Sequence, residues 1–263
     1  MTTVIISVVV ISLLGLFIGL FLGISSLKLN VETDIREDKI LEVLPGANCG
    51  GCGFAGCSAM ASAIVKGQAS VNGCPVGGEE VAKKVSEIMG VSADKSVKLR
   101  AYVKCNGACD KATKDYTYTG VKDCSFVQFV PGKGEKSCDF GCTGYGNCVK
   151  ACAFDAIEII NEVAVVNKDK CKACGKCVEA CPKNLITLIP YDSKFAVTCS
   201  SKDKGSDAMK KCKVSCIGCG LCKKNCESNA IEVEDFLATI DPDKCIGCGV
   251  CESKCPKKCI NKI

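Results

Sequence analysis

The cysteines are the residues of this chain whose number and spacing most clearly predict chemistry. The 263 residues include 26 cysteines and no histidine, so a metal site must use thiolate ligands, and catalysis that depends on imidazole is excluded. Most of the cysteines recur at intervals of two or three residues, whereas disulfide frameworks have irregular loop lengths. The pattern therefore favours metal clusters over a disulfide scaffold.

Two runs follow the C-x2-C-x2-C-x3-C-P pattern of bacterial [4Fe–4S] proteins, in which three close thiolates hold one cluster and the fourth ligates its neighbour. The first run comprises Cys171, Cys174, Cys177 and Cys181, and the second comprises Cys245, Cys248, Cys251 and Cys255. A third run, without the proline, comprises Cys216, Cys219, Cys222 and Cys226. A structural zinc site is the alternative, but zinc commonly uses two separated C-x2-C pairs.

These runs belong to a repeated module. When the segment that begins at Ala156 is placed on the one that begins at Ala230, eight cysteines coincide in one register, which indicates a duplication. Within each copy, the fourth cysteine of each run is expected to ligate the cluster of the other run, which predicts four clusters. In the first copy, Tyr145 stands at the position of Cys219 in the second, so Cys138 is predicted to be the replacement ligand. The predicted sets are Cys138, Cys142, Cys148 and Cys181; Cys171, Cys174, Cys177 and Cys152; Cys216, Cys219, Cys222 and Cys255; and Cys245, Cys248, Cys251 and Cys226.

A fifth site is predicted around residues 45–58, which read PGANCGGCGFAGCS. Gly51, Gly53 and Gly56 spell the G-x-G-x-x-G of a dinucleotide-binding loop, but such a loop follows a strand in a βαβ unit, and the preceding residues have a helical pattern. The glycines would instead let backbone N–H groups approach cluster sulfurs. The predicted ligands of this [4Fe–4S] cluster are Cys49, Cys52, Cys57 and Cys74.

The cysteines left over by these five clusters suggest a sixth. Its ligands are expected among Cys105, Cys109, Cys124, Cys199 and Cys212. The alternative is that several of these side chains are buried small apolar groups, as free cysteines often are. Cys259 lies outside the repeat pattern and is predicted to be spare.

The elements that position these cysteines are mostly short. Residues 4–24 are an uncharged apolar run that would cover about 32 Å as a helix, enough to span a bilayer. A signal peptide is the alternative, but no basic region precedes the run and no A-x-A site follows it. Residues 34–44, 58–68 and 79–89 have helical patterns, residues 116–130 favour β-structure, and a hairpin is expected between the two cysteine runs of each repeat.

The chain is thus predicted to be an α+β protein with a single N-terminal transmembrane helix, a small helical [4Fe–4S] module and two tandem two-cluster ferredoxin modules. The predicted bounds are 1–27 for the anchor, 28–91 for the helical domain, 92–137 for a linker region with extra cluster ligands, 138–190 for the first ferredoxin module, 191–211 for a connector and 212–263 for the second ferredoxin module.

The formal net charge of +5 does not predict nucleic-acid binding. Each oxidised cubane with four thiolates carries about −2, so the lysines within the cysteine runs mostly compensate local negative charge. No long basic tract is interleaved with stacking aromatics. Thiolates that bind clusters also need a reducing compartment, which places the body on the cytoplasmic side of the cell membrane.

The membrane helix, the CGGCGFAGC stretch with Cys74 downstream and the tandem ferredoxin runs together resemble the B subunit of the Rnf complex. The resemblance covers essentially the whole chain and is to the longer form of that family. It implies an electron-transport subunit of an ion-translocating ferredoxin:NAD⁺ oxidoreductase, a translocase that couples electron transfer to Na⁺ or H⁺ movement. It also implies soluble ferredoxin and the other Rnf subunits as partners, with flavin and nicotinamide sites in those subunits.

Our hypothesis is that electrons enter through the tandem modules and leave through the cluster nearest the membrane helix. One alternative is a membrane-anchored polyferredoxin that serves another anaerobic reductase, and another is a structural zinc protein. The chain has no catalytic residues of its own under any of these hypotheses. The coupling ion, the physiological direction and the order of the clusters are not encoded in these patterns.

Overall fold

The computed structural model describes residues 1–28, 34–92 and 97–263. Residues 29–33, in the predicted helical domain, and residues 93–96, in the predicted linker region, lie outside the described residues. The first element, α1 (Thr2–Lys28), is a helix of 27 residues. It contains an apolar span, Ile5–Ser25, that is long enough to cross a membrane by length and composition. A helix satisfies its own backbone hydrogen bonds, which suits such a segment to lipid.

A small helical domain follows. Its helices are α2 (Ile35–Val43), α3 (Cys57–Val65) and α4 (Gly78–Met89). The Asp34 side chain caps α2 by accepting a hydrogen bond from the backbone N–H of Arg36 at 2.9 Å, and α4 ends at Gly90, whose φ of 68° is left-handed. The three predicted helical patterns are therefore confirmed. The core between the helices is built from Ile40, Leu44, Met60, Ala61, Ile64 and Val85.

Each ferredoxin repeat contains the predicted hairpin between its cysteine runs. The strands are β2 (Ile157–Ile160) with β3 (Val163–Val166), and β6 (Ile231–Glu234) with β7 (Leu237–Ile240), both antiparallel. The two-residue turns have positive φ at both positions, 47° and 63° at Asn161 and Glu162, and 47° and 60° at Asp235 and Phe236. This is the turn geometry that matches the twist of a hairpin, and it confirms both hairpins.

Each repeat also has a second two-stranded sheet, which the sequence patterns did not indicate. β1 (Leu99–Val103) pairs antiparallel with β4 (Ile186–Pro190), and β5 (Phe195–Val197) pairs antiparallel with β8 (Ile260–Lys262). β1 and β5 lie before the predicted starts of their modules at residues 138 and 212. The modules as folded therefore begin earlier in the chain than the predicted bounds.

A short helix carries the third cysteine of each run. These helices are α5 (Asn147–Lys150), α6 (Lys176–Glu179), α8 (Leu221–Lys224) and α9 (Val250–Lys254). Each begins immediately after a glycine with left-handed φ, and each buries one cysteine side chain. The chain thus turns sharply between the second and third cysteine positions and directs the third thiol inward. A further helix, α7 (Gly205–Lys211), precedes the second repeat.

The predicted β-structure at residues 116–130 is wrong. This segment forms no strand; instead it contains the 3₁₀ helix η1 (Phe126–Phe129), and η2 (Pro131–Lys133) follows it. The reason is local, because the Asp123 carboxylate accepts hydrogen bonds from the backbone N–H groups of Ser125 and Phe126 at 2.8 and 3.3 Å. Such a turn competes with strand pairing and starts a helical turn.

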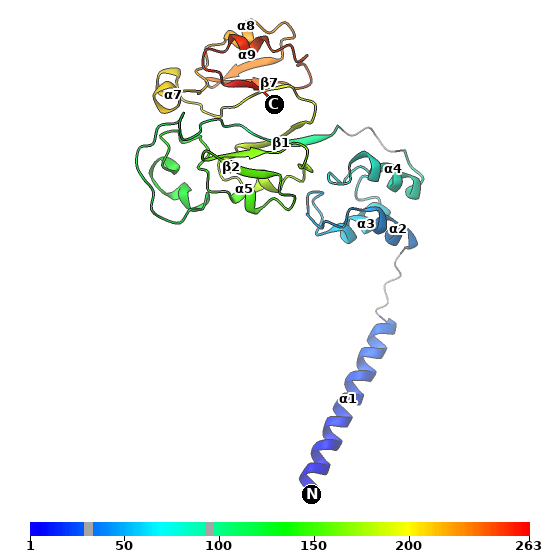
Figure 1. The fold of residues 1–263 in the computed structure, drawn as a ribbon. Helices are drawn as coiled ribbons and strands as arrows, with labels where there is room; N and C mark the ends of the chain where they lie inside the picture. The colour runs from blue at the N-terminus through cyan, green and yellow to red at the C-terminus, as the bar shows by residue number, and fades with distance from the viewer. Residues whose placement is uncertain (29–33, 93–96) are drawn as a thin grey trace.

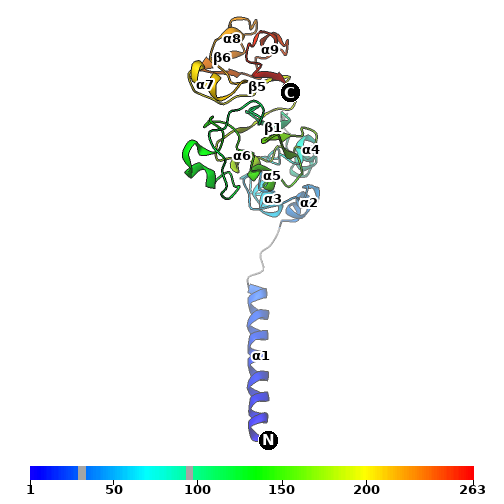
Figure 2. The ribbon, with the colours of Figure 1, turned by 60° about the vertical axis from the view of Figure 1, so that its left-hand side comes forward.

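The helical domain lies beside the first ferredoxin module, and the second module lies beyond the first. Figure 1 shows α1 extending away from the body, with the helical domain α2–α4 beside the first ferredoxin module and the second module stacked beyond the first. The view in Figure 2 agrees, with α7, α8 and α9 at the end farthest from the N-terminus. The first module therefore lies between the helical domain and the second module.

Candidate cluster-binding sites

The helical domain brings three of its four predicted ligands to the edge of its core. Cys52, Cys57 and Cys74 pack against the core side chains, and Cys49 is also partly buried. Burial raises the pKa of the Cys74 thiol, and the thiolates of Cys57 and Cys52 raise it further. The backbone N–H of Gly77 opposes this by donating to Cys74 Sγ at 3.3 Å. N–H donors to sulfur are the contacts that tune a bound cluster.

The glycines of this loop have structural roles that differ from those of a phosphate-binding loop. α2 precedes the loop, and no strand of a βαβ unit is present among the described residues around it. Gly56 has φ +142°, and a Cβ there would lie 2.9 Å from Asn48 Oδ1. That oxygen accepts a hydrogen bond from the backbone N–H of Cys57 at 2.8 Å. Gly56 therefore makes room for a cap at the start of α3, which fixes Cys57 in place.

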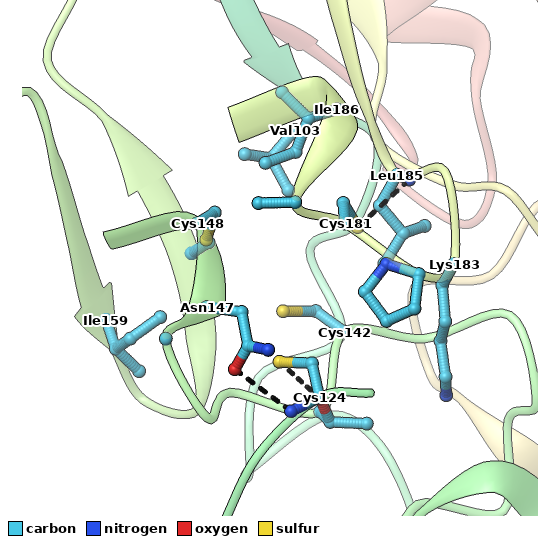
Figure 3. A pocket seen from close by; sticks show the side chains of 15 residues that line it. Val103, Cys124, Cys142, Asn147, Cys148, Ile159, Cys181, Lys183, Leu185 and Ile186 are labelled. Carbon is cyan, nitrogen blue, oxygen red and sulfur yellow. Dashed lines mark hydrogen bonds between the residues drawn. The ribbon is translucent and has the colours of Figure 1, made fainter. Parts of the chain in front are cut away.

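In the first ferredoxin module, four cysteines surround one cavity. Figure 3 shows Cys124, Cys142, Cys148 and Cys181 around the cavity, with Val103, Ile159 and Ile186 among its apolar lining. Burial, with smaller contributions from the neighbouring thiolates of Cys142, Cys124 and Cys181, raises the pKa of the Cys148 thiol to about 12. Two of the sulfurs accept hydrogen bonds, Cys181 from the backbone N–H of Leu185 at 3.4 Å and Cys124 from the Thr143 hydroxyl at 3.3 Å.

The fourth member of this group is Cys124, not the predicted Cys138. The Asn147 side chain at the start of α5 holds the Cys124 loop by accepting a hydrogen bond from the Cys124 backbone N–H at 3.0 Å. Tyr145, which stands in the ligand position of the run, stacks on Tyr118 with ring centroids 6.2 Å apart. A residue from the preceding loop therefore completes the set.

Cys138 belongs to a second cavity, between the two modules. Four cysteines line it: Cys105, Cys138, Cys199 and Cys212. Burial, with smaller contributions from the thiolates of the other three, raises the pKa of the Cys138 thiol to about 12. The structure thus separates Cys138 from the set to which its spacing assigned it. Three of the five cysteines expected to supply a sixth site line this cavity, namely Cys105, Cys199 and Cys212. Cys109, another of the five, is exposed and does not line it.

Hydrogen bonds connect this second cavity to a cluster group in each module. The backbone N–H of Cys142 donates to Cys105 Sγ at 3.4 Å, and the backbone N–H of Cys216 donates to Cys199 Sγ at 3.3 Å. Cys142 and Cys216 are equivalent positions of the repeat. The second cavity therefore contacts both modules in the same way, once on each side.

In the second predicted group of the first module, the four cysteines lie near one another. Burial, with smaller contributions from the thiolates of Cys171, Cys174 and Cys152, raises the pKa of the Cys177 thiol to about 11. Cys171 Sγ accepts hydrogen bonds from the backbone N–H groups of Ala101 in β1 at 3.3 Å and Ala173 at 3.5 Å. The strand missed by the sequence patterns thus contributes a donor to this group.

The second module repeats the arrangement. Burial, with smaller contributions from the neighbouring thiolates of Cys216, Cys219 and Cys255, raises the pKa of the Cys222 thiol to about 11. Burial also raises the pKa of Cys251, which lies near Cys245 and Cys248. Cys226, the predicted fourth ligand of that group, packs against the same apolar core as Cys251.

Cys259, predicted to be spare, is buried beside a predicted ligand. Its Sγ lies 3.5 Å from Cys255 Sγ and only 2% of the residue is exposed. Hydrogen bonding to Cys259 lowers the pKa of Cys255 to about 5 and that of Cys216 to about 6. A thiol in this place donates to its thiolate neighbours.

The donor sets fit iron–sulfur cubanes better than single ions. In the parts of the chain that the structure describes, no three cysteine, aspartate or glutamate side chains converge closely enough to hold one metal ion. A cubane places each thiolate on a separate iron, so its ligands stand farther apart than those of zinc. Positive charge lies beside the cavities, because buried Lys136 lines the second cavity and Lys183 lines the first.

Comparison with known protein families gives matches to three descriptions of iron–sulfur domains. Residues 44–76 match a putative Fe–S cluster family, residues 164–187 a 4Fe–4S binding domain and residues 215–259 a 4Fe–4S dicluster domain. These segments include the N-terminal loop, the second cysteine run of the first repeat and both runs of the second repeat. The family descriptions thus agree with clusters in the helical domain and in both ferredoxin modules.

Individual relatives are similar over most of the chain. The chain is 44% identical to the B subunit of the Na⁺-translocating ferredoxin:NAD⁺ oxidoreductase complex of Acetobacterium woodii, over 99% of this chain and 78% of that protein. It is 44% identical to the B subunit of the ion-translocating oxidoreductase complex of Methanosarcina acetivorans, over 97% and 96%. It is 42% identical to the B subunit of the proton-translocating ferredoxin:NAD⁺ oxidoreductase complex of Clostridium ljungdahlii, over 92% and 85%.

Proposed function

Since the chain belongs to the B-subunit family of Rnf-type ion-translocating oxidoreductase complexes, we propose that it is the multi-cluster electron-transfer subunit of such a complex. The complex transfers electrons between reduced ferredoxin and NAD⁺ and couples the transfer to ion movement. When bound, each [4Fe–4S] cluster accepts and releases one electron. The chain itself supplies thiolate ligands, N–H donors to sulfur and apolar walls, while flavin and nicotinamide chemistry belongs to partner subunits.

The proposed ligand sets account for six clusters. They use every cysteine except Cys109 and Cys259. The sets are Cys49, Cys52, Cys57 and Cys74; Cys171, Cys174, Cys177 and Cys152; Cys124, Cys142, Cys148 and Cys181; Cys105, Cys138, Cys199 and Cys212; Cys216, Cys219, Cys222 and Cys255; and Cys245, Cys248, Cys251 and Cys226.

The observation that carries the proposal is that these groups adjoin one another in a row. The N-terminal loop contacts the backbone of Cys174, Cys142 donates to Cys105 Sγ, and Cys216 donates to Cys199 Sγ. The group of Cys105 is therefore the bridge between the two modules. A continuous row of closely spaced redox sites is what a subunit needs to relay electrons over the length of its body.

The two ends of this row differ in a way that supports a direction from ferredoxin toward the membrane. Cys219 and Cys248, which lie two residues before α8 and α9, are exposed. Figure 2 shows these two helices at the end of the body far from α1, so a soluble donor can approach their groups closely. At the other end, the group of Cys52 belongs to the domain that follows the apolar span of α1. We assign the electron exit to that group, with membrane subunits as acceptors.

The orientation proposed for the chain is a single membrane pass with the body in the cytoplasm. Thiolate clusters are stable in a reducing compartment, and soluble ferredoxin must reach the second module. The other Rnf subunits contact the helical domain or α1 in this arrangement.

The test uses the intact complex with the Cys52→Ala variant and, as a matched control, Cys109→Ala, which removes an exposed cysteine outside every group. We expect the Cys52 variant to accept electrons from reduced ferredoxin but to pass them to the membrane subunits at a strongly reduced rate. The control should transfer at the wild-type rate. Normal transfer by the Cys52 variant would refute the exit assignment.

A further inference from the structure

We propose that Gly51 is a positioning residue that sets the distance between the N-terminal cluster group and the group of Cys171 in the first ferredoxin module. This inference rests on the proposed function, because it concerns electron passage between those two groups. It assigns to one glycine of the N-terminal loop a role across a domain interface. The step is the transfer of one electron from the cluster of one group to the cluster of the other, and no proton is transferred with it.

The contact is between the two backbones. A Cβ placed on Gly51 would lie 2.7 Å from the carbonyl oxygen of Cys174, 2.9 Å from its Cα and 3.0 Å from its Cβ. Cβ atoms essentially never approach other heavy atoms that closely. These three nearest atoms all belong to Cys174 of the other domain. Gly51 therefore lacks a side chain because the first module occupies the space where one would be.

The backbone conformation of Gly51 does not require glycine. Gly50, Gly53 and Gly56 have φ of 69°, 85° and 142°, but Gly51 is not among the residues with positive φ. Alanine can adopt the Gly51 conformation without strain. The Gly51→Ala change thus separates the effect of close approach from the effect of loop conformation, which no other glycine of this loop allows.

The Cys174 side of the contact cannot easily yield. Cys174 lies between Ala173, with φ 53°, and Gly175, with φ 80°. Ala173 also donates its backbone N–H to Cys171 Sγ at 3.5 Å, and α6 begins directly after Gly175. The residues on both sides of Cys174 have left-handed φ, and the loop is hydrogen-bonded to the Cys171 sulfur. Such a backbone conformation persists only where the surrounding contacts hold it, so the position of Cys174 is fixed.

A methyl group at residue 51 must therefore push the two domains apart. The side chain of Lys176 supports the same interface, since its Cε lies 3.5 Å from the position of a Cβ on Gly50. Electron transfer between bound clusters weakens steeply with separation, so a small displacement reduces the rate while leaving both ligand sets intact. The interface is thus a place where the subunit controls electron passage by packing.

The experiment uses the full-length, cluster-loaded protein and compares wild type, Gly51→Ala and the control Ala55→Ser, which changes an exposed position of the same loop. Iron and sulfide content are measured first. The magnetic interaction between the reduced clusters is then measured by EPR, with Cys52→Ala defining the spectrum without the N-terminal cluster. Finally, the rate of electron transfer from reduced ferredoxin to the membrane subunits is measured in the assembled complex.

We expect Gly51→Ala to retain full iron content, to lose part of the magnetic interaction that Cys52→Ala abolishes, and to transfer electrons several-fold more slowly. Ala55→Ser should match wild type in all three. An unchanged interaction and rate would overturn the role of Gly51 while leaving the exit assignment intact. Loss of iron from Gly51→Ala would also overturn it, because the glycine would then serve its own cluster loop. Normal transfer by Cys52→Ala would instead overturn the exit assignment on which this inference rests.

Discussion

The exchange of Cys138 for Cys124 gives the sharpest test of the ligand sets. We consider alanine substitutions of Cys124 and Cys138, each made singly and in combination with Cys142→Ala. Both the cysteine spacing and the structure place Cys142 in the group of Cys148 and Cys181. The structure groups Cys124 with Cys142 around one cavity and Cys138 with Cys105, Cys199 and Cys212 around another. Two substitutions in one group remove one cluster, whereas two substitutions in different groups remove two.

The expected magnitudes follow from four irons per cubane. Six clusters contain about 24 Fe, so each single variant loses about 4 Fe. The pair Cys124→Ala and Cys142→Ala also loses about 4 Fe, since both residues hold the same cluster. The pair Cys138→Ala and Cys142→Ala loses about 8 Fe. Double-mutant comparison of this kind isolates shared function from independent function.

The assay is iron and acid-labile sulfide per chain, together with EPR of the reduced protein. Cys109→Ala is the matched control and should retain all of its iron, because Cys109 is exposed and belongs to no group. The grouping is refuted if the Cys138 and Cys142 pair loses no more iron than Cys142→Ala alone, or if the Cys124 and Cys142 pair loses twice as much.

Two further predictions concern the ends of the molecule. Cys259→Ala removes the thiol that lies 3.5 Å from Cys255 Sγ, so we expect unchanged iron but a midpoint potential more negative by on the order of tens of millivolts for one cluster, measured by redox titration; an unchanged potential in every cluster would contradict this role. Deletion of α1, whose apolar span Ile5–Ser25 is not buried by the protein, should leave cluster content intact and abolish association with membrane vesicles; retained association without partner subunits would argue against the anchor.

Much of the fold could be predicted because its signals are local. Two helices of the N-terminal domain end just before Pro45 and Gly90, and the hairpin turns carry residues that accept positive φ, such as Asn161 and Asp235. The cysteine runs also encode their own geometry, since a glycine before the third cysteine starts each short helix. These features depend on a few neighbouring residues.

The features that sequence reasoning missed depend on distant parts of the chain. β1 pairs with β4 across more than eighty residues, and its short apolar pattern gives no indication of its partner. Residues 116–130 are rich in aromatic and β-branched side chains, but the Asp123 turn converts part of the segment to a 3₁₀ helix. Neither outcome follows from periodicity alone.

The assignment of Cys138 shows the same limit at the site. The cysteine spacing assigned Cys138 to the run that contains Tyr145. The fold instead brings Cys124 to the cavity of that run, where the Asn147 side chain accepts a hydrogen bond from the Cys124 backbone N–H. Likewise, Cys105, Cys199 and Cys212 are far apart in sequence and meet only because the two modules stack. The duplication offered one signal, since Cys138 and Cys212 are equivalent positions of the repeat and now lie in the same group.

The central claim is that six groups of four cysteines each hold one [4Fe–4S] cluster. The most direct measurement is the iron and acid-labile sulfide content of the full-length protein, with EPR spin counting after complete reduction. The account predicts about 24 Fe and about 24 sulfide per chain. A content of about 20 Fe or fewer, or metal without matching sulfide, would contradict it.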